Sequence, residues 1–170
     1  KKNGAQITAD VPICNLHLTD MDIADYDSNC HLRPPLRDES DRVRLVEGLV
    51  DGTISAVCSN HQPVDANAKS APFSLTQPGA STIEHILPLI MHIKKLGSEL
   101  SLKESISLVT SKPASILGIE KGMLKENGDA DICIFDPNKN TDINKSNLLS
   151  AGKNTPFGGW ELDGKVTHTI

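Results

Sequence analysis

The stretch Ile54-Ser55-Ala56-Val57-Cys58-Ser59-Asn60-His61-Gln62-Pro63-Val64 decides the fold. Its first half is apolar and nearly continuous, and it lies between Gly52 and Pro63. Such a run is typical of a parallel strand that is covered on both faces. Parallel α/β folds place their chemistry where these strands end. We therefore expect Asn60 and His61 to lie where a catalytic group would lie.

The composition excludes several classes of protein. A chain of 170 residues can bury one good core, and its 22 acidic and 17 basic residues leave a mildly acidic balance. It has no basic patch or aromatic platform that would suggest nucleic acid. Its apolar runs are too short to span a bilayer, and it shows no signal-peptide pattern. We therefore expect a cytoplasmic protein that binds neither nucleic acid nor membrane.

The cysteines indicate a reducing compartment. None of the four forms a C-x-x-C pair, and two lie inside apolar strand patterns. Scattered cysteines of this kind predict free thiols rather than a disulfide framework. The four are Cys14, Cys30, Cys58 and Cys133.

The first residues suggest that the chain begins in the middle of a fold. There is no initiator Met, and Lys1-Lys2-Asn3-Gly4 looks like a helix end with a glycine cap. An alternating strand pattern follows over residues 6–11. We therefore expect the sequence to be a fragment of a longer protein.

Helices are expected after each strand. The first covers residues 38–51, with Ser40 as a candidate cap and Val43, Val46, Leu49 and Val50 on one face. Between the strand ending at Cys58 and the next helix, residues 60–80 form a long loop of the kind that often serves as a lid or binding loop.

Two capping boxes predict the later helices. Ser81 with Glu84 begins a helix to Leu96 that Pro88 should kink, and Ser101 with Glu104 begins one to about residue 110. A further turn runs from Pro113 to Gly118.

Beyond Gly118 the pattern changes to short β segments at 123–124, 131–135 and 165–170. The order of elements predicts part of an α/β barrel followed by part of a small β domain.

Several motifs resemble the dihydroorotases, in the order in which that family has them. The most specific is the closing signature Gly152-Lys153-Asn154-Thr155-Pro156-Phe157 with Gly159-Trp160-Glu161-Leu162, which is similar in dihydroorotases, allantoinases and hydantoinases. The others are Ile7-Thr8-Ala9-Asp10-Val11, Leu18-Thr19-Asp20, Pro34-Pro35-Leu36-Arg37, Asp51-Gly52-Thr53-Ile54, Ala71-Pro72-Phe73, Pro113-Ala114-Ser115-Ile116-Leu117-Gly118 and Gly128-Asp129-Ala130-Asp131.

This resemblance implies a fold and a cofactor. In the family a TIM-type (β/α)8 barrel holds one or two zinc ions. Residues 1–120 would be the C-terminal part of that amidohydrolase barrel, with its last three strands. Residues 121–170 would be the C-terminal part of a small β-sandwich domain.

The same resemblance shows that the site is altered. Hydrolysis of a cyclic amide needs an activated water and a carboxylate that moves a proton. The family run Thr-Asp-His-Ala-Pro-His supplies that carboxylate, but here Asn60 stands at the Asp position and Val64 at the position of the second His. An amide has neither charge for zinc nor useful basicity, and valine cannot hold a substrate carboxylate.

Two further positions depart from the family. Asn15 stands where a zinc-ligating His is expected, and Arg33 stands where an Asn contacts substrate. Residues that look like scaffold are kept: Pro34, Pro35, Phe73, Asn154 and Phe157. Four changes on an intact scaffold indicate a site that has lost its activity.

The sequence therefore predicts a non-catalytic dihydroorotase homologue of pyrimidine biosynthesis, similar to the dihydroorotase-like chains that associate with aspartate transcarbamoylase. No zinc is expected in this chain, and the open edges of a partial barrel predict self-association. An alternative is an active zinc-dependent amidohydrolase with unusual ligands, for which Cys14, His17 and His61 are weak candidates. A third is a module that binds a small anion at Arg33. For His61, a hydrogen-bonded structural role is favoured over metal binding.

Overall fold

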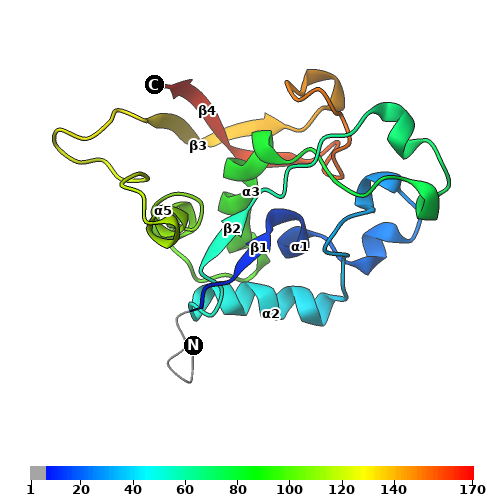
Figure 1. Ribbon diagram of the computed structural model, residues 1–170, viewed down its shortest axis with the longest axis horizontal. Helices are drawn as coiled ribbons and strands as arrows, with labels where there is room; N and C mark the ends of the chain where they lie inside the picture. The colour runs from blue at the N-terminus through cyan, green and yellow to red at the C-terminus, as the bar shows by residue number, and fades with distance from the viewer. Residues whose placement is uncertain (1–6) are drawn as a thin grey trace.

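The computed structural model describes residues 7–170. Two short parallel strands, β1 (Asp10–Pro12) and β2 (Ala56–Cys58), lie at its centre with helices around them, and a long β3–β4 hairpin lies along one side (Figure 1). The helices are α1 (Ile13–His17), α2 (Glu39–Val50), α3 (Ile86–His92), α4 (Leu102–Ser107) and α5 (Ser111–Leu117). Short 3-10 turns connect them at Asp20–Ile23, Ser28–Cys30, Ala66–Lys69, Phe73–Leu75, Ile83–His85, Ile93–Leu96 and Lys145–Asn147.

The parallel pair confirms the central prediction. Val11 pairs with Val57, and both are buried, because each strand is covered by side chains on its two faces. The first strand begins at Asp10, later than the predicted residues 6–11, while residues 1–4, predicted as a helix end, lie outside the described residues. Within residues 7–120 two parallel strands form rather than three, since the segment between them makes 3-10 turns.

Helix α2 forms close to its predicted range, with two differences. Asp38, not Ser40, is the N-cap, because its carboxylate accepts a hydrogen bond from the Asp41 backbone N–H. Val46 and Leu49 are buried as expected, but Val43 and Val50 at the edges of the apolar face are exposed.

The segment 82–96 forms without the predicted capping box. A 3-10 turn precedes α3, so Pro88 falls in the first turn of the α-helix, where its missing N–H costs little. The Ser81 hydroxyl instead donates to Gly152 O at 2.6 Å, and Glu84 accepts hydrogen bonds from the Leu149 and Ser150 backbone. Both side chains therefore bind the C-terminal segment rather than their own helix.

The next two helices agree with the sequence. Ser101 and Glu104 form the predicted capping box of α4, which ends at Ser107. The predicted turn at 113–118 lies within α5, which ends at Leu117, and its C-cap Gly118 has a φ of +68°, in the left-handed region that glycine adopts without strain.

The C-terminal part is an antiparallel hairpin of β3 (Cys133–Asp142) and β4 (Glu161–Thr169), longer than the predicted short strands. Strand β4 packs against α3, and a side chain at Gly164 would collide with the Met91 sulfur at 2.6 Å. The predicted strand at 123–124 is wrong: Met123 and Leu124 are exposed and form no ladder.

Asn154 fastens the C-terminal segment to the loop that follows β2. Its side-chain oxygen accepts hydrogen bonds from Val64 N at 3.0 Å and Ser81 Oγ at 3.1 Å. Its amide nitrogen donates to Gln62 O at 3.1 Å and Gly79 O at 3.0 Å. Both N–H groups and the oxygen of this buried carboxamide are thus engaged, with the Ser81 hydroxyl proton shared between Asn154 Oδ1 and the nearer Gly152 O.

None of the helices within residues 7–170 has the length and apolar character needed to cross a membrane.

Replacing Asn154 by alanine should lower the free energy of unfolding by about 2–4 kcal/mol, because buried partners would lose their hydrogen bonds. Urea unfolding monitored by circular dichroism measures this change. The matched variant Asn138→Ala removes an exposed side chain and should change stability by less than about 0.5 kcal/mol. Equal stability of the two variants would contradict the role given to Asn154.

Candidate functional site

The carboxyl end of β2 carries the polar run Ser59–Val64, as the sequence predicted. Asn60 has a φ of +45°, a conformation that asparagine tolerates better than most residues. Its side-chain nitrogen donates to Arg33 O at 2.8 Å, and its oxygen accepts from Gln62 Nε2 at 3.2 Å. Both ends of the Asn60 amide are therefore engaged in contacts within the chain.

His61 makes the hydrogen bonds expected of a structural histidine. Its Nδ1 atom accepts from Thr82 N at 3.1 Å and from Ile83 N at 3.3 Å. Since Nδ1 accepts, the ring proton lies on Nε2 in the neutral form. His61 thereby satisfies backbone donors at the start of the 82–96 segment, where no N-cap side chain does so.

The two predicted substrate positions lie on the loops around this strand end. Arg33 is exposed and lines a pocket of about 320 Å³ with His31 and Phe73. Val64 is half-buried, and its backbone N–H binds Asn154. Arg33 therefore lines a pocket, whereas Val64 is joined to the C-terminal segment, and Val64 is not among the residues that line the pocket of Arg33.

Helix α1 holds Cys14, Asn15 and His17, and all three side chains are buried. Asn15 donates from its side-chain amide to Pro35 O at 3.1 Å. Burial raises the pKa of the Cys14 thiol to about 12, so that the group stays protonated and is a poor metal ligand.

His17 lies in an aromatic cluster rather than at the end of β1. Its Nδ1–H donates to Ile13 O at 3.0 Å, and its ring stacks on His92 with centroids 5.5 Å apart. The rings of Phe157 and Trp160 lie in edge-type contact with the His17 ring, with centroids 6.0 and 6.3 Å away. Burial lowers the pKa of His17 to about 4, so the ring is neutral near pH 7.

The residues present do not fit a closed metal site. Within residues 7–170 no group of three or more His, Cys, Asp or Glu side chains is placed to hold a metal ion. Cys14 and His17, which share a helix, serve in packing, and His61 uses one ring nitrogen for backbone hydrogen bonds. The zinc implied by the resemblance would need ligands from outside the described part of the chain.

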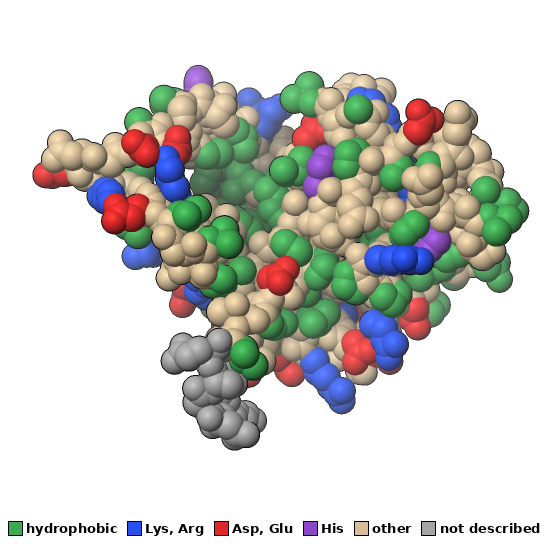
Figure 2. All heavy atoms as spheres, viewed as in Figure 1, with side chains coloured by type: hydrophobic (Ala, Val, Ile, Leu, Met, Phe, Trp, Pro, Cys, Tyr) green, Lys and Arg blue, Asp and Glu red, His purple; other side chains and the backbone are tan. Residues whose placement is uncertain are grey.

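A hollow of about 560 Å³ opens beside β2, and Figure 2 shows its hydrophobic walls below the β3–β4 hairpin. Val57 and Ser59 line it from the strand, and Phe135 lines it from β3. Ile83, Ile86, Leu87, Ile106, Val109, Met123, Leu124 and Ile132 add apolar side chains. None of the predicted site residues lines this hollow, whose lining is mostly apolar but also includes Thr110, Asp131 and Cys133.

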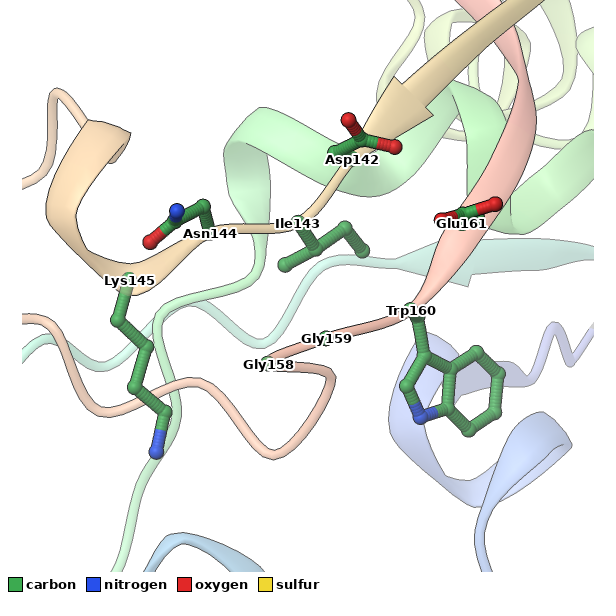
Figure 3. A pocket seen from close by; sticks show the side chains of 8 residues that line it. All are labelled: Asp142, Ile143, Asn144, Lys145, Gly158, Gly159, Trp160 and Glu161. Atoms are coloured by element: carbon green, nitrogen blue, oxygen red, sulfur yellow. The ribbon is translucent and has the colours of Figure 1, made fainter.

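A second pocket of about 470 Å³ lies where β3 ends and β4 begins (Figure 3). Asp142 and Glu161 face each other across the ladder there, while the Lys145 side chain extends in the opposite direction. The labelled side chains do not point toward a common centre, so this pocket is a weaker candidate than the end of β2.

Comparison with known proteins gives a consistent result. The model of the amidohydrolase family matches residues 77–170. The chain is 38% identical over 171 residues to a dihydroorotase of Bacillus cereus (strain G9842) and 39% identical over 170 residues to one of Thermoanaerobacter sp. (strain X514). It is covered completely in both alignments, but it spans only 40% and 39% of those relatives.

Solved structures agree with the predicted fold class. An L-hydantoinase (dihydropyrimidinase) from Arthrobacter aurescens superposes with a TM-score of 0.91 at 26% identity, over 99% of this chain and 39% of that one. A D-hydantoinase (dihydropyrimidinase) from Thermus sp. gives 0.90 at 22% identity, with the same coverage. The α/β architecture of a partial TIM-type barrel with small sheets is therefore confirmed.

The His17 environment predicts a pH-dependent stability. The pKa of His17 is about 4 in the folded state and about 6.5 in the unfolded state. The contribution of His17 to the free energy of unfolding is therefore fully present above pH 6.5 and is lost as the pH falls toward 4. The loss from this residue should approach about 3 kcal/mol. Urea unfolding between pH 8 and pH 4 measures it. The variant His17→Leu should flatten the profile, whereas exposed His168→Leu should not; identical profiles for all three proteins would refute the assignment.

Proposed function

This chain belongs to the amidohydrolase family, and we propose on that basis that it is the C-terminal part of a dihydroorotase-like protein that lacks a catalytic base of its own. In this proposal the protein serves pyrimidine biosynthesis in the cytoplasm as a non-catalytic partner of aspartate transcarbamoylase. The reaction of active relatives would be hydrolysis of a cyclic amide bond.

The observation that carries the proposal is the neutral amide at the end of β2. Proton transfer to and from a substrate needs a group whose pKa lies near the working pH. Asn60 has no such group, and its two polar atoms already bind Arg33 and Gln62. Among the residues this chain supplies to the strand end, His61 is the one titratable side chain in the run Ser59–Val64.

Retention of the scaffold supports a structural partnership. The closing segment keeps a fully buried Phe157 and a fully hydrogen-bonded Asn154. Loss of the reactive groups beside a preserved framework is the pattern expected when a fold is kept for assembly. The choice of aspartate transcarbamoylase as the partner rests on the resemblance to non-catalytic dihydroorotase-like chains.

An active metal-dependent amidohydrolase is the second candidate. The 38% identity to a dihydroorotase extends over the whole chain, and the relatives are about two and a half times longer. Ligands and a base from the other part of such a protein could complete a site at the end of β2. Because Nδ1 of His61 accepts from the backbone, its Nε2 carries the ring proton, so this chain would offer a hydrogen-bond donor there and the metal ligands would come from the other part.

The first test is metal content and dihydroorotase activity of the full-length polypeptide, alone and mixed with aspartate transcarbamoylase. We expect less than about 0.1 zinc per chain, no turnover of dihydroorotate, and co-elution with the transcarbamoylase in size-exclusion chromatography. The dihydroorotase of Bacillus cereus is the positive control for turnover. Stoichiometric zinc with turnover would refute the proposal in favour of the active enzyme.

A second test concerns the 170-residue chain by itself. A parallel sheet of two strands leaves edges that larger barrels cover by further strands. We expect this chain to self-associate at micromolar concentration, with a mass in light scattering of at least twice 18.3 kDa. A stable monomer would contradict the expectation.

A further inference from the structure

We propose that Asn15 and Asn60 form an amide clamp, in which the two side-chain amides hold segment 31–37 against α1 and the end of β2. The inference rests on the proposed function and deepens it, because both asparagines stand at positions where the resemblance implies ionisable site residues. In this protein those positions have acquired a structural task that a carboxylate cannot perform.

The clamp follows from two hydrogen bonds to the same stretch of backbone. Asn15 Nδ2 donates to Pro35 O at 3.1 Å, and Asn60 Nδ2 donates to Arg33 O at 2.8 Å. The donors come from different elements that lie 45 positions apart in the sequence, α1 and the residues after β2. The acceptors are two residues apart, on either side of Pro34.

The rest of the segment is held in the same way. His31 O accepts from Gly79 N at 2.9 Å, and Arg37 O accepts from Asp20 N at 2.9 Å. Alternate carbonyl groups at positions 31, 33, 35 and 37 thus receive donors from four separate parts of the chain.

The sequence of the segment explains why these donors matter. Pro34 and Pro35 have no N–H groups, so this stretch of backbone has an excess of acceptors over donors. Arg33, Pro34 and Pro35 are exposed, so water could also reach this stretch, and the amide donors serve to fix the course of the segment. A primary amide supplies an N–H for this purpose at all ordinary pH values.

An aspartate at either position would reverse the interaction. It has the shape of asparagine, but the ionised carboxylate only accepts, so its oxygen would face the carbonyl oxygen of Arg33 or Pro35. At Asn15 the carboxylate would also be buried, since this side chain is 8% exposed. At Asn60 a carboxylate oxygen would still accept from Gln62 Nε2, so the substitution removes only the donor to Arg33 O.

The experiment compares Asn→Asp variants of the full-length protein. N60D should lower the thermal midpoint by about 3–6 °C and N15D by at least as much, while N67D, at an exposed asparagine of the neighbouring loop, should change it by less than about 1 °C. If N15D does not fold, N15A removes the same donor without adding a charge.

Hydrogen exchange localises the effect. In N60D and N15A the amides of Gly79 and Asp20, which bind the two ends of the segment, should exchange about tenfold faster than in the unaltered protein. N67D should leave both rates unchanged. Unaltered midpoints and exchange rates in N60D and in the Asn15 variants would overturn the clamp.

Measurements of zinc content and dihydroorotate turnover separate this inference from the proposed function. N60D should gain neither stoichiometric zinc nor dihydroorotate turnover, because the carboxylate disturbs the segment that frames the strand end. N60D with unaltered stability and new turnover would overturn the clamp and leave the proposed function standing. Turnover by the unaltered protein would overturn the proposed function, whereas the stability and exchange measurements would still decide the clamp.

Discussion

The hydrogen bonds of the Asn154 carboxamide are the constraint on which the end of β2 depends. They join Asn154 to residues that lie between 73 and 92 positions earlier in the chain. The loop of residues 60–80 has little regular structure of its own, so its course is set by such contacts from outside. Ser81 and Glu84 extend the same attachment to residues 149–152. The closing signature of the sequence is thus a structural fastener for the loop around the candidate site.

Local patterns predicted the elements whose signals are local. The capping box of α4 and the Gly118 cap formed as expected, because their partners lie within a few residues. The apolar run before Cys58 also formed a strand, although its partner β1 lies 46 positions earlier, because its continuous apolar pattern by itself marks a strand buried on both faces. Ser81 and Glu84 carry the same capping-box pattern, yet their partners are 65 to 73 residues away, and no local rule distinguishes the two cases. The sequence likewise could not reveal that the segment between β1 and β2 makes turns in place of a third strand.

The candidate site was predictable in position but only partly in its interactions. The end of a buried parallel strand located Asn60 and His61, and the resemblance marked Asn15 as altered. The contacts of Asn15 and Asn60 depend on where segment 31–37 runs in space. The segment contains Pro34 and Pro35, which lack N–H groups, and this excess of backbone acceptors is the sequence signal that could have suggested amide donors. Cys14 and His17 were weak candidates for metal ligands, but α1 directs both side chains into the core.

The aromatic cluster around His17 also gives the molecule an optical property. Trp160 is the single tryptophan of these 170 residues, and its ring lies 6.3 Å from that of His17 and 6.1 Å from that of His92. Indole emission responds to polarity and to neighbouring imidazoles, so the fluorescence of Trp160 reports whether the start of the terminal strand lies against His17 of α1 and His92 of α3. The fold therefore contains its own spectroscopic label at the junction between the helical layer and the terminal hairpin.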